Sequence, residues 1–314
     1  MTYTAPQIKA KARLGDVIFS RTSIFAGGMI LVTLAAVAIF LIVQSIPAFF
    51  ASGEDASILS QAGNFWAYVW PLIFGTVWAA ILSLAMALPL AIGIALFISH
   101  YAPRKLAATL GYIVDLLAAV PSVVFGLWGI IVLAPAVQPI YSWLVDNLGW
   151  FPLFAGPVSG TGRTILTAAI VLAVMILPII TALCREVFLQ TPVLHEEAAL
   201  ALGATRWEMI RMAVIPFGRS GIVSASMLGL GRALGETMAV AMVLSATGVV
   251  TFQLLTSGNP STIAANIALS FPEAYATNVN VLIATGLILF IVTFLVNALA
   301  RYIVNRRAEF SGAN

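Results

Sequence analysis

Long apolar runs constrain this chain more than any other feature of its sequence. A helix needs about 20 apolar residues to cross the hydrocarbon layer of a bilayer. Six runs reach that length, with approximate boundaries 24–46, 72–98, 106–133, 164–183, 220–244 and 281–302. An unpaired backbone amide in lipid is strongly unfavourable, so each run is expected to be a helix. The sequence therefore predicts an all-α membrane protein with six transmembrane helices.

The composition excludes the soluble classes of protein. Of the 314 residues, 61% are hydrophobic and only 9% are charged, whereas about a quarter of a soluble domain is charged. The net charge of +3 does not indicate nucleic-acid binding, because the basic residues stand at the ends of the apolar runs and form no patch with stacking aromatic residues. Membrane lipid is the expected surrounding, and no nucleic-acid partner is expected.

Lysine and arginine set the expected orientation, because cytoplasmic loops are enriched in both. With a cytoplasmic N-terminus, the inside segments hold Lys9, Lys11, Arg13, Arg21, Arg104, Lys105, Arg185, Arg206, Arg211, Arg219, Arg301, Arg306 and Arg307. The outside loops hold only Arg163, and Arg232 lies within a run. Both termini are therefore expected in the cytoplasm. The first run is longer than a signal-peptide core, so it is expected to stay as an uncleaved span.

The prolines and the outside loops refine this plan. Pro89 and Pro121 are the expected bend points of the second and third runs. Residues 135–163 combine tryptophans with prolines and are expected to lie at the membrane interface. Residues 262–269 are apolar but too short to span. They are expected to form a helix that dips back towards the pore mouth.

Motifs of enzyme chemistry are missing from the sequence. Cys184 is the single cysteine, which excludes an internal disulfide and a cysteine-based metal cluster. His100 and His195 are far apart in sequence, and neither belongs to an H-E-x-x-H motif. No catalytic residue, metal or cofactor is expected, so the chain is not expected to be an enzyme.

The segment between the fourth and fifth runs has the pattern of a helix, a break and a second helix. Thr191 is the expected cap of the first helix and Pro192 its expected first residue. Gly203 is expected to end it, because the residue just past a helix often needs a left-handed backbone. Thr205 and Glu208 form a T-x-x-E capping box for a second helix that runs towards Pro216.

These residues also carry a family resemblance. Residues 197–199 read Glu-Ala-Ala, Gly203 follows after three residues, and residues 213–216 read Ala-Val-Ile-Pro after nine more. The pattern resembles the E-A-A-x₃-G-x₉-I-x-L-P loop of ABC-importer permeases. Ala213 replaces the usual Ile and Ile215 the usual Leu, and both keep the face apolar. We call residues 191–218 the EAA loop.

The resemblance implies the fold of a type-I ABC importer permease. It also implies that the EAA loop forms a coupling helix that docks on an ATPase subunit, through Glu197, Ala198, Ala199 and Gly203. From the residues alone, an ordinary helical connector remains an alternative. A phosphate-cradling P-loop needs G-x₄-G-K-[ST], and no lysine of this chain follows a glycine. ATP hydrolysis is therefore expected from a separate polypeptide.

The fifth run contains two charged residues. Arg232 lies well inside it, where a charge costs about 2.5–3.5 kcal/mol on insertion scales. Glu236 follows four residues later, so both would share one face of a continuous helix. Two interpretations remain open, a structural ion pair and a pair that lines the transport path. The planar fork of arginine suits an oxyanion, whereas the glutamate would repel a dianion and so favour its release.

A closer resemblance narrows the substrate. Residues 121–129, 230–240 and 262–274 are similar to the phosphate-specific branch of these permeases, of PstC type. This implies inorganic phosphate as the substrate. It also implies a sister permease of PstA type, two copies of a PstB-type ATPase and an external phosphate-binding protein as partners.

Competing hypotheses keep the membrane location but change the cargo or the energy source. The same fold could carry sulfate, molybdate or a phosphonate. A proton-coupled secondary transporter could use Asp115, Arg232 and Glu236, although Asp115 is better explained as a polar contact between helices. The EAA loop and the small number of buried ionisable groups stand against that alternative.

The expected organisation has three parts. Residues 1–70 hold the N-terminal cytoplasmic segment, the first transmembrane helix and an external loop. Residues 71–302 form the permease core of five transmembrane helices with the EAA loop, and residues 303–314 form a cytoplasmic tail.

Overall fold

The computed structural model describes the backbone of residues 14–308 and the side chains of residues 15–302. The described chain consists of helices and connecting segments, without a named β-strand. Its α-helices are α1 (Leu14–Phe50), α2 (Phe65–Leu96), α3 (Arg104–Ala118), α4 (Ser122–Trp128), α5 (Ala134–Leu148), α6 (Ile165–Leu189), α7 (Val193–Ala201), α8 (Arg206–Met209), α9 (Ile215–Leu234), α10 (Met238–Val243), α11 (Ile263–Ser270) and α12 (Thr277–Ala308). The π-helical segments are η2 (Phe97–Tyr101), η3 (Gly129–Leu133) and η4 (Ile210–Val214), and the 3₁₀ turns are η1 (Ser57–Leu59) and η5 (Phe271–Glu273).

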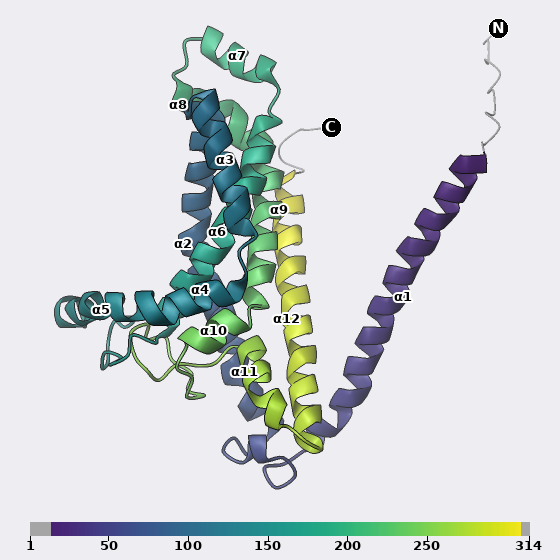
Figure 1. Ribbon diagram of the computed structural model, residues 1–314, viewed down its shortest axis with the longest axis vertical. Coiled ribbons are helices and arrows are strands. Elements are labelled where there is room, and N and C mark those ends of the chain that lie inside the picture. The colour runs from purple at the N-terminus through teal and green to yellow at the C-terminus, as the bar shows by residue number, and fades with distance from the viewer. Residues whose placement is uncertain (1–13, 309–314) are drawn as a thin grey trace.

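The predicted number of transmembrane helices is confirmed for the described part of the chain. Six helical stretches there are long and apolar enough to cross a membrane: Gly15–Phe50, Phe65–Tyr101, Ser122–Leu148, Ile165–Leu189, Arg206–Leu234 and Thr277–Tyr302. Helices α2, α6, α9 and α12 run along the long axis of the molecule as one bundle (Figure 1).

The third predicted span, 106–133, is wrong as a single helix. Helix α3 ends at Ala118, and the chain turns through residues 119–121 before α4 begins. A proline pushes the preceding residue out of the α region, so Pro121 ends α3 instead of bending a continuous helix. Helices α4 and α5 then run across the bundle (Figure 1). The first half of the predicted interfacial loop 135–163 is therefore the helix α5.

The three π-helical segments share a local cause. Each is followed, after one further residue, by a proline: Pro103 after η2, Pro135 after η3 and Pro216 after η4. In each case the residue before the proline donates its amide to the carbonyl five residues earlier. Proline lacks an amide hydrogen, and its ring clashes with the carbonyl four residues back. A π-helical turn is wider than an α-helical turn and so leaves room between the proline ring and the carbonyl four residues back. The helix therefore continues through Pro135 and Pro216.

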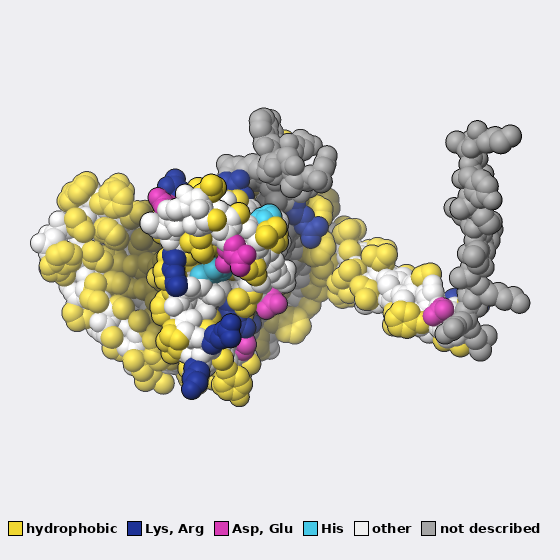
Figure 2. Space-filling view, turned by 90° about the horizontal axis from the view of Figure 1, so that it is seen from above, with side chains coloured by type: hydrophobic (Ala, Val, Ile, Leu, Met, Phe, Trp, Pro, Cys, Tyr) yellow, Lys and Arg dark blue, Asp and Glu magenta, His cyan; other side chains and the backbone are white. Residues whose placement is uncertain are grey.

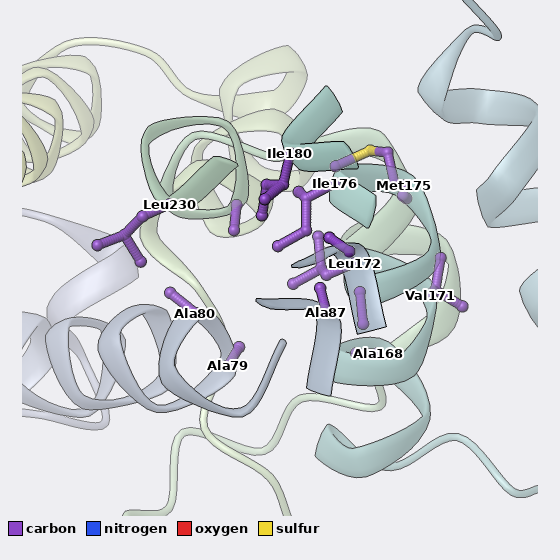
Figure 3. Packing of buried hydrophobic residues seen from close by; sticks show 14 of the residues in the cluster. Ala79, Ala80, Ala87, Ala168, Val171, Leu172, Met175, Ile176, Ile180 and Leu230 are labelled. Atoms are coloured by element: carbon purple, nitrogen blue, oxygen red, sulfur yellow. The ribbon is translucent and has the colours of Figure 1, made fainter. Parts of the chain in front are cut away.

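Small residues let α2 and α6 pack closely together. The contact between these helices is the most extensive in the described chain. Every fourth residue of α2 on this face is small and at most 1% exposed: Ala79, Ser83, Ala87, Ala91 and Ala95. Larger side chains of α6, such as Leu172 and Ile176, belong to the same buried cluster (Figure 3). Small residues at this spacing allow helix backbones to approach within a membrane. We call this row and the α6 face against it the α2–α6 seam.

Helix α1 stands apart from the bundle along most of its length (Figure 1). None of its most apolar window is buried within the chain. Its C-terminal end is anchored, because Ala48 packs in a second apolar cluster with Leu59 and Val281. The Asn280 side chain also donates to the Gln44 carbonyl at 2.8 Å. The loop that follows α1 thus packs against the start of α12.

One end of the molecule carries α7 and most of the charged side chains. Helix α7 projects from this end, and the start of α1 and the end of α12 lie in the same half (Figure 1). Lysine, arginine and acidic side chains gather there (Figure 2). Lys9, Lys11 and Arg13, which support the predicted orientation, lie outside the described residues, as do residues 309–314 of the predicted tail.

The opposite half holds the short helix predicted for residues 262–269. This helix is confirmed as α11, and it packs against α2, α10 and α12. Thr262 caps it by accepting a hydrogen bond from the Ala265 amide at 3.3 Å. Two side chains of α2 hold α11 in place, as described below.

Candidate functional site

The first helix of the EAA loop begins one residue later than predicted. Pro192 is the capping residue of α7, with an extended backbone at φ −61° and ψ 124°, and no side chain caps this helix. The predicted cap by Thr191 is therefore wrong. Thr191 stands before the cap, and its buried hydroxyl has no hydrogen-bond partner. Proline takes the cap because it has no amide hydrogen to satisfy there.

Gly203 ends α7 as the sequence predicted. Its φ is +86°, in the left-handed region that glycine adopts without strain. Its amide donates to the Leu200 carbonyl at 2.9 Å, and the Ala204 amide donates to the Ala199 carbonyl at 3.2 Å. These two bonds form a Schellman motif, which satisfies the last carbonyls of the helix.

The predicted capping box of the second helix is confirmed. The Thr205 amide donates to Glu208 Oε2 at 2.8 Å, and the Glu208 amide donates to Thr205 Oγ1 at 3.4 Å. The helix that starts here does not stop at Pro216. Helices α8 and α9 join through η4 into one apolar stretch, Arg206–Leu234. The second helix of the EAA loop is thus the first part of the fifth span.

Helix α7 offers its surface to a partner instead of burying it. None of its residues is buried. Leu194 within the helix is 75% exposed, and Leu202, just beyond its end, is 90% exposed. Glu197 and Ala198 are exposed, and Ala199 is half-buried against the main core. The structure thus brings Glu197, Ala198, Ala199 and Gly203 into one projecting element, with the glutamate and the leucines open to solvent.

Arg232 and Glu236 do not share a continuous helix, contrary to the sequence prediction. Helix α9 ends at Leu234, and Gly235 caps it. Arg232 and Glu236 are absent from the ion pairs within 4.0 Å in the described chain. Glycine at position 235 lets the helix stop here, because it combines low helix propensity with backbone freedom. The interpretation as a structural ion pair, one of the two that the sequence left open, is therefore wrong for the described structure.

Arg232 lines a large cavity within the described part of the chain. This cavity has a volume of about 1160 Å³ and lies between α6, α9 and α12. Its wall is mostly apolar, with Ser224, Asn297 and Arg301 as its other polar residues. One turn earlier on α9, Gly229 lets Ile180 of α6 approach closely. Helix α9 thus packs closely against α6 at Gly229, while Arg232 lines the cavity.

Glu236 has a local partner instead of the arginine. Its side chain is buried, at 8% exposure. Its Oε1 accepts a hydrogen bond from the Ala239 amide, in the first turn of α10, at 3.1 Å. A carboxylate is favourable at this position, because the first amides of a helix lack partners within the helix. Glu236 therefore fixes the turn between α9 and α10.

The remaining ionisable groups of the described residues do not assemble into a proton relay. Asp115 of α3 forms an ion pair with Arg185 of α6, with Oδ2 and Nη2 3.6 Å apart. This confirms the predicted contact between helices. Asp115 lines a different cavity from the one that Arg232 lines. No cluster able to hold a metal ion occurs among the described residues.

Sequence reasoning missed one polar contact at the base of α7. His100 Nε2 lies 3.3 Å from Glu196 Oε1. The two residues are 96 positions apart, so no motif joins them. The available signals were a histidine just past the second run and an acidic first turn of α7, both on the predicted cytoplasmic side.

Comparison with known proteins places the chain in a family. The family of binding-protein-dependent transport system inner membrane components matches residues 87–309. The chain is 49% identical over 310 residues to phosphate transport system permease protein PstC 2 of Mycobacterium tuberculosis, covering 95% of this chain and 94% of the relative. It is 36% identical over 308 residues to PstC of Haemophilus influenzae, covering 94% and 95% of the two chains.

Solved structures match the arrangement of helices. A chain of a bacterial ABC transporter involved in the import of the acidic polysaccharide alginate matches with a TM-score of 0.57 and 19% identity, over 93% of this chain and 99% of that chain. A chain of the inward-facing methionine transporter MetNI matches with a TM-score of 0.53 and 21% identity, over 82% and 99%. The fold is therefore that of a type-I ABC importer permease. The chain belongs to the binding-protein-dependent transport system inner membrane components, as a multi-pass protein of the cytoplasmic membrane.

Proposed function

We propose that this chain is the permease subunit of an ATP-driven importer of inorganic phosphate. The observation that carries the substrate is the likeness to phosphate permeases over nearly the whole of both chains, at 49% and 36% identity. The solved structures support the fold but not the cargo, because the transporters they match are linked to alginate and methionine.

The EAA loop is the proposed docking element for the ATPase. Helix α7 projects from one end of the molecule and buries none of its residues (Figure 1). Its uncovered leucines and Glu197 suit a groove on a partner protein, since exposed apolar groups in water favour association. Gly203 acts indirectly, by fixing the angle between α7 and the fifth span. Docking on a partner also explains why Leu202 is exposed, which an ordinary helical connector would not explain.

Arg232 is the proposed contact for phosphate within the membrane. It lines a cavity of about 1160 Å³ with a mostly apolar wall. A guanidinium can donate two parallel hydrogen bonds to a phosphate group. Intramembrane charges usually mark a transport path, because they are too unfavourable to keep without a function. Glu236 is proposed to shape the path through the α9–α10 turn rather than to touch the anion.

The proposed assembly contains four kinds of protein. This chain pairs with a sister permease of PstA type, two copies of a PstB-type ATPase dock at the EAA loops, and an external phosphate-binding protein delivers the substrate. Both chain termini face the cytoplasm, on the side of α7. The chain itself is proposed to be non-catalytic, because its sequence lacks the glycine-lysine pair of a P-loop.

Uptake by the reconstituted complex tests this proposal. Proteoliposomes that hold both permeases and the ATPase should accumulate radiolabelled phosphate only with ATP and the external binding protein. Excess sulfate, molybdate and a phosphonate are added separately as competitors. Loss of uptake with one of these, and its own ATP-dependent accumulation, would assign that oxyanion instead. Uptake driven by a proton gradient without ATP would contradict the importer proposal.

A further inference from the structure

A polar contact connects α7 with the membrane-embedded bundle. His100 Nε2 and Glu196 Oε1 lie 3.3 Å apart, and their side chains are 9% and 23% exposed. The other ring nitrogen of His100 lies 2.7 Å from the Ser99 hydroxyl. The histidine is therefore held on both sides, and its ring is largely withdrawn from solvent.

The contact joins two helix ends whose charges complement each other. His100 belongs to η2, the last turns of the long second span, and Glu196 lies in the first turn of α7. The C-terminal end of a helix carries partial negative charge and favours a cation, whereas the N-terminal end favours an anion. The Glu196 carboxylate lies in the first turn of α7, where a helix favours an anion, and the His100 ring nitrogen lies against it.

Few other interactions hold the first half of α7 against the bundle. Helix α7 has no buried residue and no side-chain cap. Ala199, near its other end, is its one residue packed against the main core in the described chain. A cavity of about 270 Å³ separates α7 from the start of the fifth span, and Arg206 is the other charged residue that lines it. The His100–Glu196 contact thus closes one side of a small gap.

The second span also reaches the opposite end of the molecule. There the Thr76 hydroxyl accepts a hydrogen bond from the Ile263 amide at 2.9 Å. The Tyr68 hydroxyl donates to Asn266 Oδ1 at 2.6 Å. Both partners belong to α11. Helix α2 therefore links α7 at one end to α11 at the other, and the α2–α6 seam stiffens it in between.

We propose that His100 and Glu196 are positioning residues that make α7 move together with α2. When the ATPase displaces α7, this contact carries the displacement into α2 and so to α11 at the other end. The inference rests on the proposed function, because it assumes that an ATPase docks on α7. It adds a named contact within this chain, outside the residues that would touch the ATPase or phosphate.

The test measures how much ATP is hydrolysed for each phosphate taken up. His100→Ala and Glu196→Ala are reconstituted in the complete complex, with His100→Gln as the conservative variant, because an amide can still donate to Glu196. We expect both alanine variants to raise the ratio of ATP to phosphate at least about fivefold, the low end of measured couplings between sites. His100→Gln should lie between these and the wild type. The double alanine variant should match the single variants, because one shared contact is lost.

A purely structural role gives a different result. Loss of folded complex lowers hydrolysis and uptake together, so the ratio would stay at the wild-type value and overturn the proposal. Asp146→Asn, which neutralises an exposed carboxylate on α5, is the control and should leave the ratio unchanged. An equal rise of the ATP-to-phosphate ratio in Asp146→Asn would also contradict the proposed role of His100 and Glu196. A wild-type complex that takes up no phosphate would instead contradict the proposed function, so the two failures are distinguishable.

Discussion

The α2–α6 seam and the EAA loop hold their shapes by different means. In the seam, a row of small residues on α2 is at most 1% exposed, and tertiary packing fixes the helices. In the EAA loop, α7 buries no residue, and hydrogen bonds between neighbours in sequence fix the backbone. This difference suits a transporter in which the stiff helix bundle follows the movement of α7 when a partner protein is bound to it. It also predicts that the two regions fail differently when they are mutated.

The largest expected effect is on the seam. Ala87→Leu adds a side chain where the present one is 0% exposed. Overpacking a core costs about 1–3 kcal/mol, and more where backbones are in close contact. We expect most of the protein to be lost from the membrane, measured by immunoblot, and a lower unfolding temperature in detergent. Ala85→Leu on the exposed face of α2 is the matched control and should behave as wild type. Equal losses in both would mean that the seam is not tightly packed.

The next largest effect is expected at Arg232, which belongs neither to the α2–α6 seam nor to the EAA loop. Arg232→Ala should lower phosphate uptake at least about tenfold at unchanged abundance, as expected for the loss of a hydrogen bond from a charged donor. Arg232→Lys keeps the charge without the fork and should recover part of the uptake. Because Glu236 bonds the Ala239 amide, Glu236→Ala should instead lower the unfolding temperature. Uptake at wild-type level in Arg232→Ala would remove this residue from the path.

The double variant tests the missing ion pair directly. If Arg232 and Glu236 act separately, the stability changes of the two alanine substitutions should add to within about 0.5 kcal/mol in the double variant. Recovery of stability in the double variant would show that the two charges do compensate each other in the membrane, which the structure does not support.

Local signals in the sequence were sufficient where neighbours in sequence decide the structure. Gly203 and the Thr205–Glu208 box determine their turns through bonds spanning a few residues, so the pattern alone predicted them correctly. The six apolar stretches follow from the thickness of the bilayer. Thr191 failed because its neighbour Pro192 competed for the same capping position, and a residue pattern does not rank two adjacent caps.

Other features depend on contacts that are distant in sequence. Pro121 ends a helix, whereas Pro135 and Pro216 are absorbed by π-helical turns, although each of the three follows an apolar residue. Whether a proline ends the helix or the helix continues through it depends on where the following helix packs, as α4 packs against α10. The His100–Glu196 contact likewise requires α2 and α7 to end at the same place. Neither is encoded in a short motif.

A smaller effect is expected at Gly203, within the EAA loop. A Cβ atom added there meets nothing within 4 Å, so any penalty comes from the φ of +86° alone. An L-residue in the left-handed region costs about 1–2 kcal/mol, and a β-branched one is a clear outlier. Gly203→Val should insert normally but lose co-purification with the ATPase and uptake. Gly203→Asn should retain most of both, because asparagine tolerates this conformation. Equal behaviour of the two variants would mean that backbone geometry is not the cause.

The smallest effect is expected at the capping box. Thr205→Ala removes the hydroxyl that accepts from the Glu208 amide, and losing such a cap costs about 1 kcal/mol. The start of the fifth span should fray, and amide hydrogen exchange of residues 206–209 should rise about fivefold, the factor that corresponds to this free energy. Thr205→Ser keeps the hydroxyl and should exchange at the wild-type rate. Exchange in α7 should not change, because the Schellman motif at Gly203 fixes that helix independently. Faster exchange throughout α7 would show that the two helices of the EAA loop form one cooperative unit. The EAA loop would then not be held by local hydrogen bonds alone, and its difference from the α2–α6 seam would be smaller.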